Sequence, residues 1–583
     1  MSAAHPPGPS NAVVARRLVE IRTLMELAGE PFYKFTAYER AAATLENAPP
    51  VSDLIAAGEL EALPGIGKSI AGRIVEIVRT GTCAYYEQLC TTYPPSIFEV
   101  LGVQGIGVKT AAMLWRDHGV ASLADLEQAL AAEALVGIRG LGPKSLENIK
   151  RGLLAYKGRL ARTPLGIALP LARELVADIA TNSPARDVTF AGSVRRAEPT
   201  VGDIDIVCTS DDPEAVIRHF VGWERAEAVL AEGTTKASVW LAGGLQIDLR
   251  VLPAHLYGNL LQHFTGSREH NIQLRERAVR MGLRVSENGI LNLTTGAEAT
   301  ARTEDEVYAA LGLAFVPAEM RLGLGEIEAA ANGTLPTPVA QGDLRGDFHM
   351  HSTWSDGVDS LEAMVAAAAR RGYEYHAISE HSQSRGAAFG LAPERLRAQR
   401  AEIRALGARH GIRTLCASEV DLRADGSLDF ADDVLAELDF VIASVHDALR
   451  QSREEMTARL IRACEHPYVN VIGHPTGRQI GSFDGYEFDF DAVFAAAART
   501  GTALEIDGQP KRLDLPSQLA RRARDAGVTF TLDSDAHSVA DLENVAYAVG
   551  QARRAWIEPA RVLNARPLEA VLEFVAAKRG RAR

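Results

Sequence analysis

The sequence predicts a multidomain protein that combines α+β and α/β domains, and three observations support this fold class. Its 583 residues exceed what one hydrophobic core can organise, because single cores stop growing near roughly 250 to 300 residues. A Gly-x-Gly unit followed by an amphipathic stretch occurs three times before residue 160, which indicates helical modules. After residue 345, short apolar strands alternate with helical stretches, which favours a parallel, barrel-like sheet.

Composition narrows the class of protein. The chain is 47% hydrophobic and 23% charged, as globular proteins are, and no segment approaches the roughly 18 uninterrupted apolar residues of a membrane span. The start, MSAAHPPGPS, lacks the regions of a signal peptide, so we expect a soluble cytoplasmic protein without membrane contact. The cysteines form no C-x-x-C pair, and we expect them to be small buried side chains in a reducing compartment: Cys83, Cys90, Cys208, Cys416 and Cys464.

The net charge of -13 at first argues against a nucleic-acid partner. However, residues 1–160 balance 16 basic against 16 acidic side chains, so the acidic excess lies later in the chain. Carboxylates that bind divalent cations lower the formal charge without repelling a nucleic acid, because the bound ions restore positive potential. The overall acidity is therefore weak evidence against DNA binding.

The N-terminal repeat points to phosphate binding. Its copies are LPGIGKSIAGRI (63–74), VQGIGVKTAAML (103–114) and IRGLGPKSLENI (138–149). The glycines allow a tight turn, and the following helix offers free N–H groups and the positive end of its dipole to a phosphate. A single copy is weak evidence, since helix corners that merely pack also use glycine, but three copies with a lysine are stronger.

These copies resemble helix-hairpin-helix motifs, which bind the sugar-phosphate backbone without reading base sequence. The resemblance assigns DNA contacts to two glycines and one lysine of each copy: Gly65, Gly67, Lys68, Gly105, Gly107, Lys109, Gly140, Gly142 and Lys144.

A first catalytic pattern follows residue 160, where the sequence pattern changes from predicted helices to predicted strands. In GDIDIV, Asp203 and Asp205 are two residues apart, so both side chains point to one face of a strand. Asp248, in QIDLRVL, lies on an expected neighbouring strand. Three converging carboxylates repel one another unless divalent cations neutralise them, and oxygen ligands select Mg²⁺ or Mn²⁺. Two such ions suit in-line phosphoryl transfer, whereas the alternative of ordinary surface acids conflicts with the apolar neighbours on these strands.

Together, AGSVRRAEPTVGD, GDIDIV, DLR and LLQHFTGSREHNIQLRERA resemble the nucleotidyltransferase palm and nucleotide-binding segment of family X DNA polymerases, the group that includes DNA polymerase beta. The resemblance implies that Asp203, Asp205 and Asp248 bind the metals and that Asp248 takes the primer 3′-hydroxyl proton. It also implies nucleotide contacts: Gly192, Ser193, Arg196 and Gly202 at the phosphates, Phe264 and Gly266 at the sugar, and Asn271 at the minor-groove edge of the base.

The segment FYKFTAYERAAATLEN resembles the 5′-phosphate pocket of the small gap-binding domain of that family, with Lys34 and Tyr38 as phosphate ligands.

Two positions depart from the family. His263 replaces a tyrosine, which puts discrimination against ribonucleotides in doubt. Arg73 replaces the lysine nucleophile of the deoxyribose-phosphate lyase, and because a protonated arginine forms no Schiff base, we expect no efficient lyase activity beyond a weak contribution from Lys68.

A second catalytic pattern opens at DFHMHSTWSDG, where His349 and His351 share one face of a strand. Alone this pair is weak evidence for a metal site. Later strands each end in another ligand-type residue, and the carboxyl ends of parallel strands meet at one mouth of a barrel. The full set resembles the PHP (polymerase and histidinol phosphatase) domain, a trinuclear metal phosphoesterase with a distorted (β/α)7-type barrel.

The resemblance distributes nine ligands over three ions. The first ion would take His349, His351, Glu419 and Asp535, the second Glu419, His446 and His474, and the third Asp356, His381 and His537. Mixed histidine and carboxylate ligands favour Mn²⁺ or Zn²⁺ over Mg²⁺, and such ions generate a hydroxide nucleophile near neutral pH. Lys511 and Arg512 either contact a substrate phosphate or form surface ion pairs, and His376 is expected to pack rather than bind a metal.

The predicted organisation runs in six parts: a 5′-phosphate-binding domain with a helix-hairpin-helix (1–85), a second helix-hairpin-helix subdomain (86–160), the palm (161–256), the nucleotide-binding thumb (257–325), a linker (326–345) and the PHP domain (346–583). We expect a monomeric, nucleoid-associated DNA repair enzyme that uses deoxynucleoside triphosphates on gapped or nicked duplex DNA with a 5′-phosphate. The PHP domain would act as a 3′-to-5′ exonuclease, with abasic-site endonuclease or 3′-phosphatase chemistry left open. Two alternatives remain: a phosphatase for small monoesters fused to DNA-binding modules, and a non-catalytic end-joining scaffold.

Overall fold

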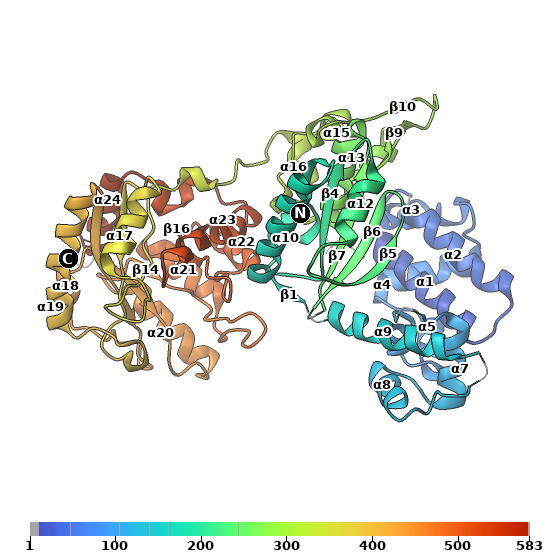
Figure 1. Cartoon of the computed structure of the whole chain (residues 1–583), viewed down its shortest axis with the longest axis horizontal. Coiled ribbons are helices and arrows are strands. Elements are labelled where there is room, and N and C mark those ends of the chain that lie inside the picture. The colour runs from blue at the N-terminus through green and yellow to red at the C-terminus, as the bar shows by residue number, and fades with distance from the viewer. Residues whose placement is uncertain are drawn as a thin grey trace. The chain divides into compact units, whose positions relative to one another are not determined.

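The computed structural model of the chain describes residues 11–46, 48–103, 105–138, 140–160, 162–242 and 244–580 (Figure 1). It divides into two compact units, which are described separately. The first unit holds Met1–Thr163, Val176–Phe190 and Gly202–Leu313, and the second holds Pro164–Leu175, Ala191–Val201 and Ala314–Arg583.

The first unit begins with nine helices, drawn in blue to cyan in Figure 1: α1 (Asn11–Leu27), α2 (Phe32–Glu46), α3 (Val51–Ala57), α4 (Lys68–Thr80), α5 (Ala84–Thr92), α6 (Ile97–Leu101), α7 (Val108–His118), α8 (Leu123–Ala131) and α9 (Pro143–Leu160). They build two hydrophobic cores, one centred on α1, α2 and α4 and one on α6 to α9. Their amphipathic patterns supply the buried faces, so each predicted Gly-x-Gly copy joins two packed helices.

The glycines of these copies have distinct structural roles. The first glycine of each has a positive φ (83° at Gly65, 97° at Gly105 and 95° at Gly140), a conformation that L side chains rarely adopt. The second glycine precedes the first residue of α4 and of α7, and among the described residues no side chain caps either helix. The first amides of both helices are therefore left for an external acceptor such as a phosphate.

A five-stranded sheet in the order β2-β4-β7-β6-β5 follows, drawn in green in Figure 1. Its strands are β2 (Arg186–Phe190), β4 (Asp203–Thr209), β5 (Ala226–Glu232), β6 (Lys236–Leu241) and β7 (Gln246–Leu252). The central pair β4 and β7 is parallel and the other pairs are antiparallel. Helix α12 (Pro213–Val221) belongs to the first unit, and α10 (Leu165–Asn182) is divided between the two units. The short elements α11 (Gly192–Arg195) and β3 (Thr200–Val201) belong to the second unit, and β1 (Thr163–Pro164) lies at the division.

The first unit closes with a small α+β subdomain made of α13 (Tyr257–Thr265), α14 (Arg268–Arg280), β8 (Leu283–Ser286), β9 (Gly289–Asn292), β10 (Glu298–Ala299) and α15 (Glu304–Ala310). The three strands form an antiparallel sheet in the order β10-β9-β8. Ser267 caps α14 by accepting a hydrogen bond from the amide of His270, which fixes where this helix starts.

The second unit contains a parallel sheet of six strands that neighbour one another in chain order: β11 (Tyr375–Ile378), β12 (Arg413–Asp421), β13 (Phe440–Ser444), β14 (Val471–Ile472), β15 (Ala503–Asp507) and β16 (Phe530–Asp533). Their residues are almost all buried, as expected for strands covered on both faces. The helices of this unit are α16 (Glu326–Asn332), α17 (Leu361–Arg370), α18 (Pro393–His410), α19 (Asp432–Glu437), α20 (Arg453–Glu465), α21 (Phe490–Thr500), α22 (Ser517–Asp525), α23 (Val545–Arg554) and α24 (Leu568–Gly580).

The segment Asp347–His351 closes this sheet into a barrel. On one side the amide of Ala377 donates to the carbonyl of Asp347 (2.9 Å), and on the other the amide of His351 donates to the carbonyl of Ala536 (2.8 Å). The segment therefore lies between the first and last strands and supplies the seventh position of the ring. This closure confirms the predicted parallel barrel and gathers the strand ends at one mouth.

The segment predicted as a linker is largely ordered within the second unit. Glu326–Asn332 forms α16, and Val339 is fully buried in the barrel core. The glycines and prolines of this segment predict an irregular linker. The run EIEAAAN is nevertheless rich in strong helix formers, and tertiary packing holds the residues that follow it.

Among the described residues, no helix is long and apolar enough to cross a membrane.

His376 is packed, as the sequence predicts, and it makes stability depend on pH. It is fully buried, neither ring nitrogen has a hydrogen-bond partner among the described residues, and burial lowers its pKa to about 3. Its folded pKa lies below the unfolded value of about 6.5, so unfolding takes up a proton in that window and stability falls as the pH drops below about 6.5. Between pH 7 and pH 5 this residue alone should cost about 2 kcal/mol. Urea unfolding in EDTA should show a weaker pH dependence for His376→Leu than for the wild type, and equal dependence would refute the assignment.

Candidate active sites

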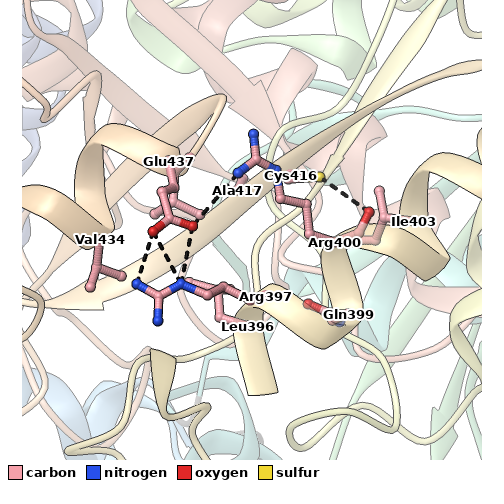
Figure 2. A pocket seen from close by; sticks show the side chains of 10 residues that line it. Leu396, Arg397, Gln399, Arg400, Ile403, Cys416, Ala417, Val434 and Glu437 are labelled. Atoms are coloured by element: carbon pink, nitrogen blue, oxygen red, sulfur yellow. Dashed lines mark hydrogen bonds and ion pairs between the residues drawn. The ribbon is translucent and has the colours of Figure 1, made fainter. Parts of the chain in front are cut away.

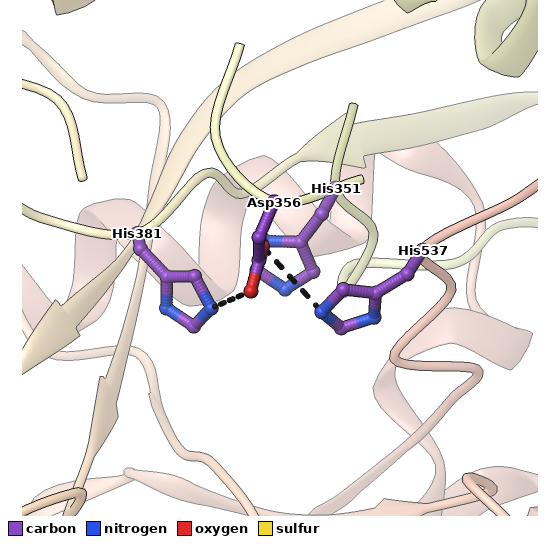
Figure 3. Close-up of side chains that lie close together, drawn as sticks. All are labelled: His351, Asp356, His381 and His537. Carbon is purple, nitrogen blue, oxygen red and sulfur yellow. Dashed lines mark ion pairs between the residues drawn. The ribbon is translucent and has the colours of Figure 1, made fainter. Parts of the chain in front are cut away.

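The predicted ligands of the second unit converge on one cluster at the mouth of the barrel. Figure 3 shows four of them facing one another from three different segments of the chain. His381 Nε2 lies 3.4 Å from Asp356 Oδ2, and His537 Nε2 lies 3.5 Å from Asp356 Oδ1. Three sets of ligand atoms lie within 4.8 Å of one another: His351 with Asp356, His381 and His537; His349 with His351 and Asp535; and His381 with Glu419 and His446.

Glu419 sits at the centre of this cluster and uses both carboxylate oxygens. Its Oε1 lies 2.8 Å from His474 Nε2 and 3.2 Å from His446 Nε2. Its Oε2 lies 3.4 Å from His349 Nε2 and 3.7 Å from His351 Nε2. A carboxylate placed in this way can bridge two cations, with a different group of histidines around each.

Carboxylates and histidines in the cluster strongly shift one another's pKa. Burial would lower the pKa of His381, but the carboxylates of Glu419 and Asp356 outweigh it and raise the pKa to about 10. Burial is likewise outweighed at His537, where Asp356 and Asp535 raise the pKa to about 9. In the metal-free protein these imidazoles hold protons that balance the buried carboxylates. A divalent cation would replace those protons, so metal binding is expected to release them.

The donor set fits divalent metal ions. Within the part of the chain that the structure describes, several buried ring nitrogens have no hydrogen-bond partner: His349 Nε2 and both ring nitrogens of His351. Buried polar atoms are normally satisfied, so unpaired nitrogens that face carboxylates fit a bound cation. Imidazole and carboxylate donors together suit Mn²⁺ or Zn²⁺.

Two further carboxylates, which the sequence pattern did not predict, orient the histidines. Glu505 Oε1 lies 2.7 Å from His349 Nδ1, and Asp421 Oδ1 lies 2.6 Å from His446 Nδ1. Each carboxylate fixes the tautomer of its histidine and directs Nε2 into the cluster. Asp421 follows the same period-two spacing as the ligands, since it is two residues after Glu419 on β12, whereas Glu505 lies on β15, which carries none of the predicted ligands.

Arg512 and Lys511 occupy different environments. The Arg512 side chain is only 16% exposed, and its Nε lies 3.9 Å from Asp535 Oδ2 and 3.7 Å from Asp507 Oδ2. Its carbonyl accepts a hydrogen bond from Arg478 Nε (2.7 Å), which anchors the loop. Lys511 is exposed. The structure therefore places a guanidinium, and not the lysine, beside the ligand Asp535.

The predicted catalytic carboxylates of the first unit share one face of the sheet. Asp205 on β4 lies directly opposite Asp248 on the parallel strand β7, and Asp203 lies opposite Gln246. Ser238 and Gln246 both donate hydrogen bonds to Asp248, the latter to Oδ1 at 3.0 Å and Oδ2 at 2.9 Å. Period-two alternation buries the intervening isoleucines of β4 and turns the aspartates to the other face.

The predicted nucleotide residues fall in two segments. Gly192, Ser193 and Arg196 belong to the second unit, whereas Gly202 directly precedes β4 in the first. The Ser193 hydroxyl is buried and has no partner among the described residues, and Arg196 Nη2 lies 3.7 Å from Glu198 Oε1. A buried, unpaired hydroxyl on a glycine turn suits a phosphate oxygen.

The segment after α13 holds the other predicted nucleotide contacts. The Arg250 guanidinium lies 5.2 Å from the centre of the Phe264 ring, and Gly266, with a φ of 65°, ends α13. The Asn271 amide is used internally: Nδ2 donates to the carbonyl of His263 (2.8 Å), and Oδ1 accepts from Gln262 (2.8 Å). These bonds hold the carboxamide in place, and the second N–H of Nδ2 is the donor that the predicted contact with a base would use.

The lysines of the three helix-hairpin-helix copies are all exposed: Lys68, Lys109 and Lys144. Lys34 is exposed and pairs with Glu30 at 2.9 Å, while Tyr38 is buried with an unpartnered hydroxyl among the described residues. The Arg73 guanidinium lies 3.9 Å from the ring centre of Tyr85 and 5.5 Å from that of Tyr38. This stacking holds a permanently charged group at the position where the family resemblance implies a lyase nucleophile.

A small pocket in the second unit lies apart from the metal-ligand cluster. Figure 2 shows it between α18, α19 and β12, where Arg397 and Arg400 reach toward Glu437. Arg397 Nη2 lies 2.8 Å from Glu437 Oε1, so an ion pair spans the pocket. On its lining, Gln399 donates to Glu380 (2.9 Å), a buried carboxylate that also accepts from Ser352. Gln399 therefore supports, through Glu380, the segment that precedes Asp356, and none of the described lining residues belongs to the predicted ligand set.

Comparison with protein families assigns four parts of the chain. A helix-hairpin-helix domain matches residues 9–83, a SAM-like helix-hairpin-helix tandem matches 97–153, a DNA polymerase beta thumb matches 260–322, and a PHP domain matches 347–499. These matches confirm the predicted helix-hairpin-helix, thumb and PHP parts.

Three relatives match different shares of the chain. The DNA polymerase/3′-5′ exonuclease PolX of Bacillus subtilis (strain 168) is 37% identical over 96% of this chain and 98% of its own length. DNA polymerase lambda of Arabidopsis thaliana is 26% identical over 54% of this chain and 63% of its own length. A probable phosphatase of Shewanella sediminis (strain HAW-EB3) is 30% identical over 40% of this chain and 94% of its own length.

Fold and sites define a class of metal-dependent phosphoryl-transfer enzyme with DNA-binding helical modules. The carboxylate face on β4 and β7 and the histidine cluster of the barrel are its two candidate centres. Within that class, the chain belongs to the family X DNA polymerases that carry a C-terminal PHP domain.

Proposed function

We propose that this protein fills gaps in DNA with its palm and trims 3′ ends with its PHP domain. The observation that supports the proposal is the presence of two groups of candidate ligands in one chain, namely three carboxylates on one sheet face and nine histidines and carboxylates at the barrel mouth. Gapped or nicked duplex DNA with a 5′-phosphate and deoxynucleoside triphosphates are the proposed substrates. The proposed location at the nucleoid and the proposed monomeric state follow from this role.

In the palm, the proposed chemistry is attack of a primer 3′-hydroxyl on the α-phosphate of the incoming nucleotide. Asp203, Asp205 and Asp248 would hold Mg²⁺ or Mn²⁺, which neutralises charge on the reacting phosphates. Asp248 takes the hydroxyl proton, and hydrogen bonds from Ser238 and Gln246 fix the orientation of its carboxylate. Ser193 and Arg196 bind the β- and γ-phosphates through a hydroxyl and a guanidinium.

In the PHP domain, the proposed chemistry is hydrolysis of the terminal phosphodiester of a 3′ end. The nine ligands would hold three Mn²⁺ or Zn²⁺ ions, which lower the pKa of a bound water to near neutrality. Glu505 and Asp421 keep His349 and His446 in the required tautomers, and the Arg512 guanidinium binds the phosphate. Abasic-site endonuclease and 3′-phosphatase activity use the same chemistry and remain within the proposal.

The test is an assay of the purified protein with Mn²⁺ on a 5′-phosphorylated gapped duplex. With deoxynucleoside triphosphates the primer should lengthen, and without them it should shorten from its 3′ end. The phosphatase alternative instead predicts turnover of histidinol phosphate or similar monoesters and an unchanged primer. A scaffold predicts neither reaction.

Arg512 is expected to contribute to the trimming reaction. Arg512→Ala should lower the exonuclease rate by roughly 10- to 100-fold, because a charge-assisted hydrogen bond to phosphate is worth about 1.5 to 3 kcal/mol. Lys511→Ala, the matched control at the exposed neighbour, should stay within about twofold of the wild type. Equal rates for both variants would place Arg512 in a purely structural role.

The lyase reaction is expected to be inefficient. Arg73 stacks on two tyrosines and cannot form a Schiff base, so borohydride should trap little protein on incised abasic DNA. The residual signal should fall further in Lys68→Ala. Trapping at the yield of a lysine-dependent lyase would show that another residue serves as the nucleophile.

A further inference from the structure

The turn that carries Ser193 and Arg196 rests on helix α23 within the second unit. Arg554, at the last residue of α23, donates from Nη1 to the carbonyl of Arg196 (2.5 Å) and from Nη2 to Glu198 Oε2 (2.7 Å). One turn earlier, Gln551 Nε2 donates to the carbonyl of Ala197 (2.8 Å). Three hydrogen bonds therefore connect three consecutive residues of the turn to one helix.

The contact is close and buried. Arg554 is 6% exposed and Gln551 is fully buried, so both side chains make these hydrogen bonds away from solvent. A Cβ atom at Gly550 of α23 would lie 2.9 Å from the Cβ of Ala197, closer than side chains normally approach. A glycine within a helix costs about 1 kcal/mol, and here it permits the approach of the turn.

Glu198 links the two arginines. Its Oε2 accepts from Arg554, while its Oε1 lies 3.7 Å from Arg196 Nη2. The backbone of Arg196 and one carboxylate beside its guanidinium are thus both held by Arg554. A planar guanidinium that donates to two acceptors at once restricts their positions more than a single ammonium contact does.

We infer that Arg554 and Gln551 are positioning residues for nucleotide binding: α23 of the PHP domain holds the phosphate-binding turn of the polymerase in its working conformation. The inference rests on the proposed role of Ser193 and Arg196 toward the triphosphate. A turn released from α23 has to be ordered by the nucleotide itself, which weakens binding.

The experiment compares Arg554→Ala with Arg553→Ala in the full-length protein. Arg553 is the neighbouring arginine on α23, and it contacts Glu319 and the carbonyl of Val339 instead of the turn. Gap filling is measured over a range of nucleotide concentrations, exonuclease activity on the same preparations, and the melting temperature of each variant. Glu198→Ala and the double variant Glu198→Ala/Arg554→Ala complete a double-mutant cycle.

Arg554→Ala is expected to raise the KM for the nucleotide about tenfold with kcat and exonuclease activity within about twofold, because a charge-assisted contact is lost. Arg553→Ala should leave all three unchanged, and the double variant should be no worse than Glu198→Ala. If KM matches that of Arg553→Ala, or if all activities and the melting temperature fall together, the inference is wrong. If the wild type incorporates no nucleotide, the proposed polymerase function fails instead.

Discussion

The Asp203→Ala/Asp205→Ala variant is expected to lose gap-filling synthesis by at least about a thousandfold and to keep 3′-to-5′ degradation. Both carboxylates share the face of β4 that lies beside Asp248, so their removal leaves one carboxylate to hold the metals. Loss of metal-assisted charge stabilisation worth several kcal/mol corresponds to this factor. Primer extension and primer degradation on the same gapped duplex measure the two activities.

The control for this variant is Asp211→Ala. Asp211 is exposed, lies just after the end of β4, and pairs with Arg186 at 3.6 Å. It should extend primers at the wild-type rate. Measurable extension by the double variant above a hundredth of the wild-type rate would remove these aspartates from the catalytic role.

Glu419→Gln is expected to abolish trimming, with a rate loss of about a thousandfold, and to leave gap filling within about twofold of the wild type. Glu419 faces His446 and His474 with one oxygen and His349 and His351 with the other, so the change weakens two metal positions at once. An amide has one carbonyl oxygen and no negative charge, so it cannot bridge cations as a carboxylate does. Exonuclease assays and metal analysis of the purified variant, after loading with Mn²⁺ and desalting, measure both effects.

Glu437→Gln is the matched control, because Glu437 lies on α19 of the same unit and pairs only with surface arginines among the described contacts. It should retain wild-type metal content and trimming. A Glu419→Gln protein with full metal content and full exonuclease activity would contradict the bridging role.

Local spacing predicted which acidic and histidine side chains share a face, whereas the nucleotide contacts and the assignment of nine ligands to three ions were implied by the family resemblance. Period-two alternation placed Asp203 with Asp205 and His349 with His351, and the strand ends of a parallel barrel brought the remaining ligands together. The pairing of Asp205 with Asp248 depends on the parallel register of β4 and β7, which spacing alone does not determine.

The rest could not be predicted because it depends on contacts between distant segments. Glu505 reaches His349 across 156 residues of sequence, and Arg554 reaches Glu198 across 356. The glycines and prolines after residue 325 predict a linker. The burial of Val339 in the barrel core could not be predicted from the sequence pattern. Tertiary packing overrides local composition in such segments.

The central claim is that one chain carries two independent phosphoryl-transfer centres. The most direct test gives the wild type, Asp203→Ala/Asp205→Ala and Glu419→Gln the same 5′-phosphorylated gapped duplex, with a mismatched 3′ primer end, Mn²⁺ and all four deoxynucleoside triphosphates. The wild type should remove the mismatch and then fill the gap, the aspartate variant should only shorten the primer, and Glu419→Gln should retain the mismatch yet extend a matched primer. Loss of both activities in either variant, with the fold intact, would contradict two separate centres.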